Sequence, residues 1–125
     1  MERKTRQRDA IAAALREADR PLSPQELLDL SSRQTPGIGI ATVYRTIKAM
    51  VDERLLTPVE IPGEPPRYEV AGKSHHHHFH CKKCDRVYEM KGCPGPLKKL
   101  APPGFEVQGH EVLLYGICSA CQKSR

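Results

Sequence analysis

Five cysteines and six histidines are the residues of this chain best suited to metal or redox chemistry, and all of them lie at or beyond position 75. Four of the cysteines form two C-x-x-C pairs, Cys81 with Cys84 and Cys118 with Cys121. Four thiolates in two close pairs match the closed tetrahedral site of structural zinc. One such pair alone suits a redox site equally well, but two pairs in one short domain favour zinc. The odd cysteine count and the absence of an export signal argue against a disulfide framework.

A run of histidines, broken once by Phe79, covers positions 75–80 just before the first cysteine pair. An expression tag would be terminal and unbroken, which leaves a solvated polar turn or a metal-binding strand. Alternate side chains of an extended strand share a face, so such a strand can serve two sites. One face would carry His76, His78 and His80, and the other His75, His77 and Phe79.

Other polar residues lie near enough to join these two faces. Glu69 and Glu89 are carboxylates that can complete the first, and His110 can join the second. Imidazole together with carboxylate suits iron, manganese or zinc. The unpaired Cys93 has two interpretations, a small buried or surface residue and a conditional metal ligand.

Composition limits the class of protein. A chain of 125 residues and 14.0 kDa makes one or two small domains, and with 38% hydrophobic and 28% charged residues it can form a modest core. No apolar run approaches the roughly 18 residues that span a bilayer, and no signal peptide is recognisable. We therefore expect a cytoplasmic protein without a membrane partner. The net charge of +5 permits nucleic-acid binding without demonstrating it.

The first half of the chain reads as three helices followed by a hairpin. Apolar residues have helical spacing over residues 7–18 and again over residues 40–55. Between them, Ser23, Pro24 and Glu26 have the spacing of a capping box at the start of a second helix. Two short extended segments, residues 57–61 and 67–70, flank a stiff Pro- and Gly-rich tip. This order of elements is that of a winged helix, whose third helix enters the major groove of DNA.

The third helix has an apolar face and a small, polar, basic face. Its apolar residues are Ile40, Val43, Ile47, Met50, Val51 and Leu55. Its opposite face carries Thr42, Arg45 and Lys48, with Tyr44 at the edge. Such a face suits a major groove, although an ordinary amphipathic helix has the same pattern. Arg67, at the hairpin, is placed to reach a phosphate.

The second half is expected to be a small α/β unit around the metal ligands. Strands are predicted over residues 86–90, 105–108 and 111–115, and a short helix over 97–101. Neither C-x-x-C pair is predicted to open a helix, which argues against a thiol-disulfide enzyme. The overall fold class is therefore α+β, with domains at residues 1–72 and 73–125. A domain of about 50 residues usually needs a metal or a partner subunit for stability.

Several motifs occur together over nearly the whole chain and in one order. They are Thr5-Arg6-Gln7-Arg8, Gly39-Ile40-Ala41-Thr42-Val43-Tyr44-Arg45-Thr46, the run from His75 to Cys84, Gly104-Phe105-Glu106-Val107 with His110, and Leu114-Tyr115-Gly116-Ile117-Cys118-Ser119-Ala120-Cys121. In this combination the chain resembles the ferric uptake regulator family of bacterial metal-responsive repressors. The resemblance implies an N-terminal winged helix, a C-terminal α/β dimerisation domain, and a homodimer that binds double-stranded DNA with an A/T-rich palindrome.

Site residues follow from the resemblance position by position. It implies that Tyr44 and Arg45 read bases, while Arg3 or Lys4 reaches the minor groove. The structural zinc ligands would be Cys81, Cys84, Cys118 and Cys121. The sensing site for Fe(II), Mn(II) or Zn(II) would be formed by Glu69, His76, His78 and Glu89. The second C-terminal site would be formed by His75, His77 and His110.

Two positions depart from the family pattern. The family often takes one sensing histidine from just before the second helix, where this chain has Pro21. The acidic ligand usual in the second site has no clear match, so either Cys93 replaces it or the site is incomplete. Zinc-sensing members often have a cysteine where this chain has Glu69, which favours iron or manganese sensing; a peroxide sensor with oxidisable histidines is a further alternative.

The chain therefore has three candidate functions. The first is a metal-dependent dimeric transcriptional repressor that controls metal homeostasis or oxidative-stress genes, and it is not an enzyme. The rivals are a thiol-disulfide oxidoreductase and a zinc carrier that does not bind DNA. The helix with Tyr44 and Arg45 argues against the carrier. No catalytic acid–base set is recognisable in the sequence, which argues against the enzyme.

Overall fold

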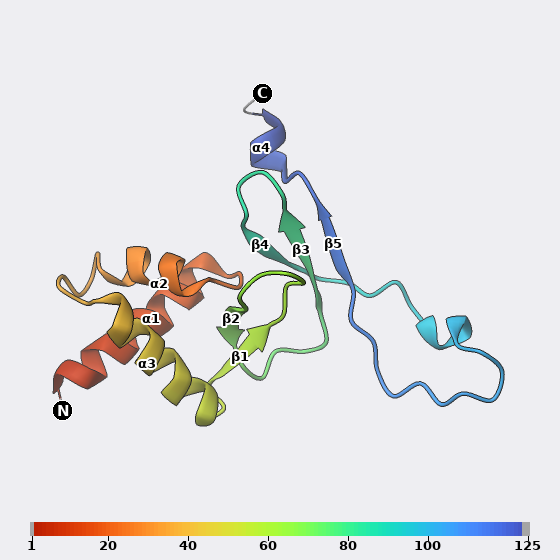
Figure 1. Cartoon of the computed structure of the whole chain (residues 1–125), viewed down its shortest axis with the longest axis horizontal. Coiled ribbons are helices and arrows are strands. Elements are labelled where there is room, and N and C mark those ends of the chain that lie inside the picture. Colours follow the sequence, from red (N-terminus) through yellow and green to blue (C-terminus); the bar gives the residue numbers. More distant parts are fainter. Residues whose placement is uncertain (1, 124–125) are drawn as a thin grey trace. The chain divides into compact units, whose positions relative to one another are not determined.

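The computed structural model describes the backbone of residues 2–123 and the side chains of residues 6–123. The chain divides into two compact units, Met1–Lys73 and Ser74–Arg125, each with its own secondary structure (Figure 1). Helices dominate the first unit and strands the second, so the fold class is α+β as predicted. No described helix combines the length and apolarity needed to cross a membrane.

Three helices form most of the first unit: α1 (Glu2–Ala18), α2 (Pro24–Ser31) and α3 (Ile40–Asp52). α1 begins five residues before the predicted start at residue 7, since the polar residues Glu, Arg, Lys and Gln that precede its apolar stripe are good helix formers. α2 begins with the expected capping box: Ser23 Oγ accepts a hydrogen bond from Glu26 N at 3.1 Å, and Glu26 Oε1 accepts one from Ser23 N at 3.1 Å.

α3 buries the middle of its predicted apolar face but neither end. Val43, Ile47 and Met50 are buried. The helix ends at Asp52, and Arg54 then adopts a positive φ of 63°, which turns the chain away. Leu55, which was predicted to end the helix, therefore lies beyond it and is 47% exposed. At the other end, the first residue of the helix, Ile40, is 40% exposed.

The hairpin consists of β1 (Leu56–Val59) and β2 (Arg67–Val70), paired antiparallel so that Leu56 faces Val70. Leu22, between α1 and α2, forms a two-way backbone bridge with Tyr68 at 2.8 and 2.9 Å, which attaches the hairpin to the helices. One apolar core joins all these elements. Its buried members are Ile11, Ala14, Leu15, Leu22, Leu27, Ile38, Val43, Ile47, Met50 and Leu56.

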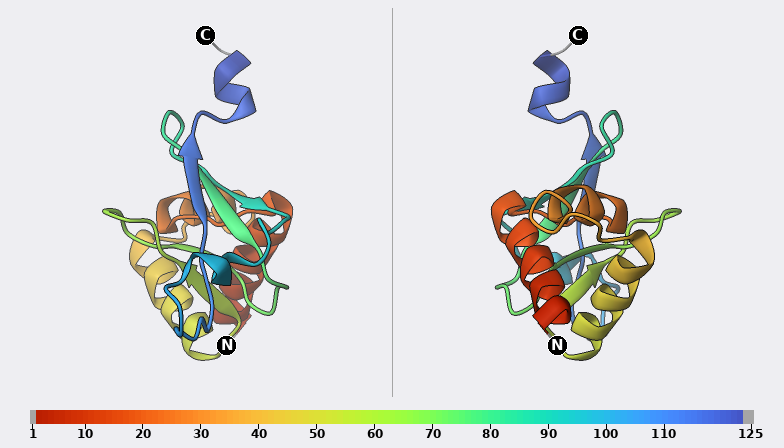
Figure 2. Two further views of the ribbon diagram at one scale, coloured as in Figure 1. Left: turned by 90° about the vertical axis from the view of Figure 1, so that its right-hand side faces the viewer. Right: turned by 90° about the vertical axis from the view of Figure 1, so that its left-hand side faces the viewer.

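The second unit is a three-stranded sheet in the order β4-β3-β5. The central β3 (His77–Cys81) pairs antiparallel with β4 (Val87–Met90) and parallel with β5 (Leu113–Gly116). A 3-10 helix η1 (Leu97–Leu100) lies in the β4–β5 crossover, and α4 (Ser119–Lys123) follows β5 (Figure 2).

Two predictions for this unit were wrong. Residues 105–108 form no strand, because the segment between Gly104 and Gly109 finds no partner strand in its unit. α4 begins directly after Cys118, so the second cysteine pair does open a helix.

The second unit has very little apolar core. Its buried residues, among those the structure describes, are His77, His80, Cys81 and Val87. A unit of this size with so little buried apolar surface needs stabilisation from a metal or a partner.

Candidate metal centres and nucleic-acid interface

The four paired cysteines meet at one end of the small sheet. Cys81 is the last residue of β3, and Cys84 follows in the turn before β4. The parallel register pairs Cys81 with Gly116, so the chain beyond β5 delivers Cys118 and Cys121 to the same end. The topology of the sheet therefore brings together two pairs that are separated by 33 intervening residues in the sequence.

The distances between these sulfurs suit a tetrahedral ion. All four lie within 4.8 Å of one another, with Cys81 Sγ 3.8 Å from Cys121 Sγ and Cys84 Sγ 3.9 Å from Cys118 Sγ. Zinc–sulfur bonds of about 2.3 Å in a tetrahedron place the sulfurs about 3.8 Å apart. The donor set and its spacing therefore fit zinc, with no room for a further ligand.

Hydrogen bonds to sulfur favour the thiolate form at two of these positions. The backbone N–H groups of Cys84 and Cys118 donate to Cys81 Sγ at 3.4 and 3.3 Å. These donors, Cys84 first, lower the pKa of Cys81 to about 5. The pKa of Cys118 is lowered by the backbone N–H of Cys121 and then by the Tyr88 hydroxyl, which donates to Cys118 Sγ at 3.6 Å.

The fourth sulfur of this centre, that of Cys121, has a raised pKa. Desolvation and the neighbouring thiols raise the pKa of Cys121 to about 12, so this sulfur keeps its proton until a cation displaces it.

His80 does not share a site with His76 and His78: it is 2% exposed, and its Nε2 lies 2.6 Å from Asp85 Oδ1. Asp85 has a positive φ of 66°, which asparagine and aspartate tolerate better than most residues. The His80–Asp85 pair, which the sequence analysis missed, thus holds the turn of the first cysteine pair.

A second cluster contains His75, His77 and His110, as predicted by resemblance, and also Cys93. His110 Nε2 lies 3.1 Å from both His75 Nε2 and Cys93 Sγ. The His77 ring packs against the His75 and His110 rings, with centroids 4.5 and 5.1 Å away. The four donor atoms lie within 4.8 Å of one another, so they can hold one ion.

His77 is the most buried histidine of this cluster, at 2% exposed. Its Nδ1 accepts a hydrogen bond from Val112 N at 3.1 Å, whereas its Nε2 is buried and has no hydrogen-bond partner among the described residues. Desolvation, followed by the neighbouring imidazoles, lowers the pKa of His77. The ring is therefore neutral at neutral pH, the form that binds cations.

The opposite face of the histidine strand holds the remaining C-terminal candidates. The His76 and His78 rings have centroids 4.8 Å apart, and His78 pairs across the sheet with Glu89 in β4. Side chains of directly paired residues share a face, so these three can approach one ion. Glu69 lies on β2 of the other unit, and its place in the sensing site stays a prediction. Pro21 is fully buried between α1 and α2 and offers no ligand.

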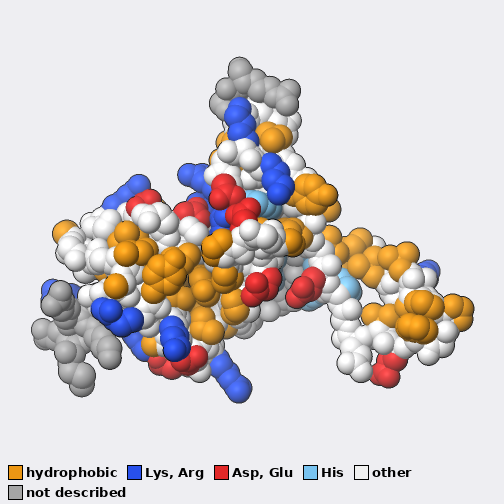
Figure 3. All heavy atoms as spheres, viewed as in Figure 1, with side chains coloured by type: hydrophobic (Ala, Val, Ile, Leu, Met, Phe, Trp, Pro, Cys, Tyr) orange, Lys and Arg blue, Asp and Glu red, His pale blue; other side chains and the backbone are white. Residues whose placement is uncertain are grey.

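The predicted DNA-reading residues lie on the outer face of α3. Tyr44 is 56% exposed, and Arg45 and Lys48 are also exposed. Arg45 donates to Thr42 Oγ1 at 3.1 Å, which orients its guanidinium along the helix. Lysine and arginine side chains lie among apolar ones over this unit (Figure 3).

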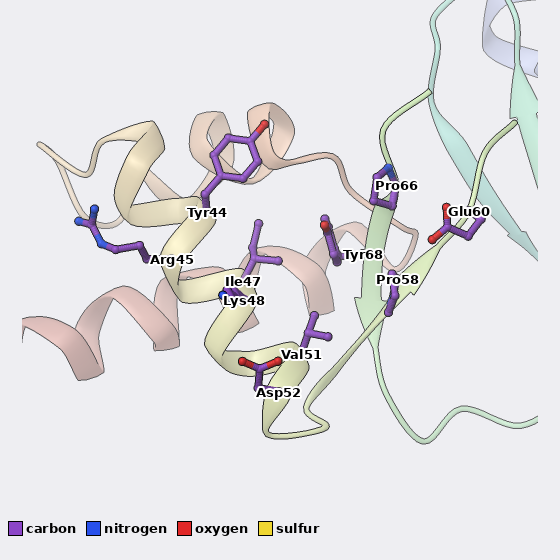
Figure 4. Close-up of a pocket in the computed structure, with 10 residues that line it drawn as sticks. All are labelled: Tyr44, Arg45, Ile47, Lys48, Val51, Asp52, Pro58, Glu60, Pro66 and Tyr68. Carbon is purple, nitrogen blue, oxygen red and sulfur yellow. The ribbon is translucent and has the colours of Figure 1, made fainter. Parts of the chain in front are cut away.

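A largely apolar pocket of about 550 Å³ separates this face of α3 from the hairpin. Tyr44, Arg45 and Lys48 line it from the helix, and Pro58 and Tyr68 from the strands (Figure 4). Charged side chains also line this pocket, namely Arg45, Lys48, Asp52 and Glu60.

The other predicted nucleic-acid contacts have different outcomes. Arg67 donates to Glu64 Oε1 at 3.0 Å, and its Nη1 lies 3.6 Å from Glu26 Oε1. Two carboxylates of its own unit therefore hold this guanidinium, and its contact with a phosphate stays a prediction. Arg3 and Lys4 lie in the first turn of α1, but their side chains fall outside the described residues.

The geometry is that of an α+β protein with a four-cysteine knuckle and histidine clusters on one small mixed sheet, where the donor groups among the described residues could hold metal ions. A family model for the ferric uptake regulator family matches residues 2–115. The chain belongs to this family, so it is a metal-responsive transcription regulator and not an enzyme.

Individual relatives agree with this assignment. The ferric uptake regulation protein of Campylobacter jejuni is 31% identical and matches 97% of this chain and 80% of its own length. Among solved structures, the Helicobacter pylori ferric uptake regulator is 25% identical with a TM-score of 0.70, over 93% of this chain and 79% of that one. A zinc-bound manganese uptake regulator is 29% identical with a TM-score of 0.76, over 90% and 87%.

Proposed function

We propose that this chain is a dimeric, metal-dependent repressor that binds double-stranded DNA through a winged helix formed by its first unit. The observation that carries the proposal is the exposed polar face of α3, where Arg45 stands opposite the buried Val43 and Ile47 and the exposed Tyr44 lies at the edge. The hairpin of β1 and β2 supplies the wing. An A/T-rich palindrome, in which each subunit reads one half-site, fits a two-fold symmetric dimer.

The second unit is proposed to bind structural zinc and to form the dimer. Support comes from the four-sulfur geometry and from the exposed apolar residues Leu114 and Tyr115 on β5, next to a very small core. The sensing site is proposed to comprise Glu69, His76, His78 and Glu89. Its carboxylates and imidazoles suit Fe(II) or Mn(II), which we favour over Zn(II) at this site.

The reading helix can be tested by mobility shift on a palindromic A/T-rich duplex, with and without added metal. We expect Arg45→Ala and Tyr44→Ala each to lose about 1–3 kcal/mol of binding free energy, because each removes one base contact. Lys98→Ala, an exposed charge change in the second unit, is the matched control. Unchanged affinity in both α3 variants would show that another surface reads the DNA.

A further inference from the structure

The histidine cluster on the second face of β3 contains a thiol. Cys93 follows β4, and its Sγ lies 3.1 Å from His110 Nε2, which in turn lies 3.1 Å from His75 Nε2. The three atoms come from segments far apart in the sequence, before β3, after β4 and before β5. Metal–nitrogen bonds of about 2.0–2.1 Å in a tetrahedron place two nitrogens about 3.3 Å apart. The observed spacing is therefore close to that of ligands around one ion.

A buried nitrogen without a partner supports the same site. His77 Nε2 belongs to a ring that is 2% exposed, and it has no hydrogen-bond partner among the described residues. A buried polar group left unpaired is costly, about 1–3 kcal/mol. Because Val112 N donates to Nδ1, the neutral ring carries its proton on Nε2; for Nε2 to bind an ion, this proton must move to Nδ1 and the hydrogen bond from Val112 N must open.

We propose that Cys93 is a thiolate ligand of this cluster and that it restricts the site to zinc-class cations rather than iron or manganese. The ligands are His75, Cys93 and His110, with His77 in the fourth position. Thiolate is a soft ligand and, with imidazole, favours tetrahedral zinc, whereas manganese prefers oxygen ligands. The inference goes beyond the proposed function, since it concerns the metal class of a centre distinct from the sensing face and is independent of DNA binding.

Cobalt reports the ligand directly, because a Co(II)–thiolate bond absorbs in the near ultraviolet. The full chain, with its four-cysteine site filled by zinc, is titrated with Co(II). We expect a thiolate-to-metal charge-transfer band that saturates at about one equivalent of cobalt bound to this centre per chain, and no such band in Cys93→Ser. A band that persists in Cys93→Ser would place the cobalt at the four-cysteine site and overturn the proposal.

Cys93→Asp is the matched variant that replaces sulfur by oxygen while keeping a ligand. We expect it to bind cobalt without the charge-transfer band and to gain Mn(II) affinity relative to the wild type. In Cys93→Ser the zinc affinity of this centre should fall by at least about tenfold, since even outer-shell changes typically cost 10–100-fold. Equal zinc and manganese affinities in all three proteins would contradict a thiolate ligand.

An experiment on the unmodified chain covers the case in which a variant does not fold. Cys93 is exposed, so an alkylating agent should modify it readily when the centre is empty. Added Zn(II) should slow this reaction, as measured by mass spectrometry of the Cys93 peptide. Alkylation at the same rate with and without Zn(II) would overturn the proposal, whatever the variants do.

Discussion

At the scale of single residues, the four-cysteine centre depends on donors that are not themselves ligands. Tyr88 is on β4, and its hydroxyl donates to Cys118 Sγ at 3.6 Å. This hydrogen bond is the first cause that raises the pKa of Tyr88 to about 12, and it also helps to lower the pKa of Cys118. The tyrosine thus stabilises the negative sulfur that zinc requires.

Removing that hydroxyl should make the zinc easier to displace with acid. A thiolate with a lowered pKa stays charged until the pH falls through that pKa, and protons then compete with the metal. In Tyr88→Phe the pKa of Cys118 rises, so we expect zinc release to begin at a higher pH and zinc affinity to fall about 10–100-fold. Zinc release against pH, followed with a chromogenic chelator, measures this.

Tyr115→Phe is the matched control, because Tyr115 lies on β5 of the same sheet and is 70% exposed. We expect its zinc-release curve to coincide with that of the wild type. A Tyr88→Phe curve that also coincides would show that the hydroxyl does not support the thiolate.

At the scale of secondary-structure elements, α2 is short and depends on its first turn. It has eight residues, fewer than an isolated helix needs in water. The reciprocal bonds between Ser23 and Glu26 satisfy two backbone donors at its start. Glu26 also pairs with Arg20 at 2.8 Å and contacts Arg67, so the cap is connected to the hairpin.

Ser23→Ala should therefore destabilise the first unit. The expected loss is about 1 kcal/mol of unfolding free energy, typical for removal of an N-cap side chain. Urea denaturation followed by circular dichroism measures it. Ser32→Ala, a half-buried position at the other end of α2, should change the unfolding free energy by less than about 0.5 kcal/mol. Equal effects of the two substitutions would contradict the capping role.

At the scale of the whole molecule, the two kinds of metal centre are expected to do separate tasks. The cysteine centre lies at one end of a sheet that has little apolar core, so its ion contributes to folding. The His76 and His78 side chains occupy a different face of β3. A metal there raises DNA affinity only if it binds the DNA-competent conformation more tightly than the alternative.

We expect His76→Ala combined with His78→Ala to give a folded, zinc-containing dimer that no longer gains DNA affinity from added Fe(II), Mn(II) or Zn(II). The lost coupling should be about 1–3 kcal/mol. Cys81→Ser should instead lose zinc and weaken the dimer. DNA binding against added metal, with dimer mass measured in parallel, separates the two. A full metal response in the double variant would place sensing at another site.

Local patterns in the sequence were sufficient for the elements of the first unit. The capping box at Ser23, the apolar spacing through Val43 and Ile47, and the hairpin all depend on neighbours a few residues apart, which the sequence displays directly. The paired cysteines also indicated a zinc site, because each pair is local and its chemistry is specific.

The rest depended on contacts between distant segments. Only the parallel pairing of β3 with β5 decides that Cys118 lies beside Cys81 and Cys84, and only the β4–β5 crossover brings Cys93 to His110. The same reason explains the error at residues 105–108, which have strand-like residues but no partner strand. It also explains why the ion pairs of Arg67 with Glu26 and Glu64 were not foreseen. Residue types and their local spacing indicated which residues can bind metal and which segments are helical. The tertiary structure decided which of those residues share a site, because that depends on pairing across the chain that local patterns do not encode.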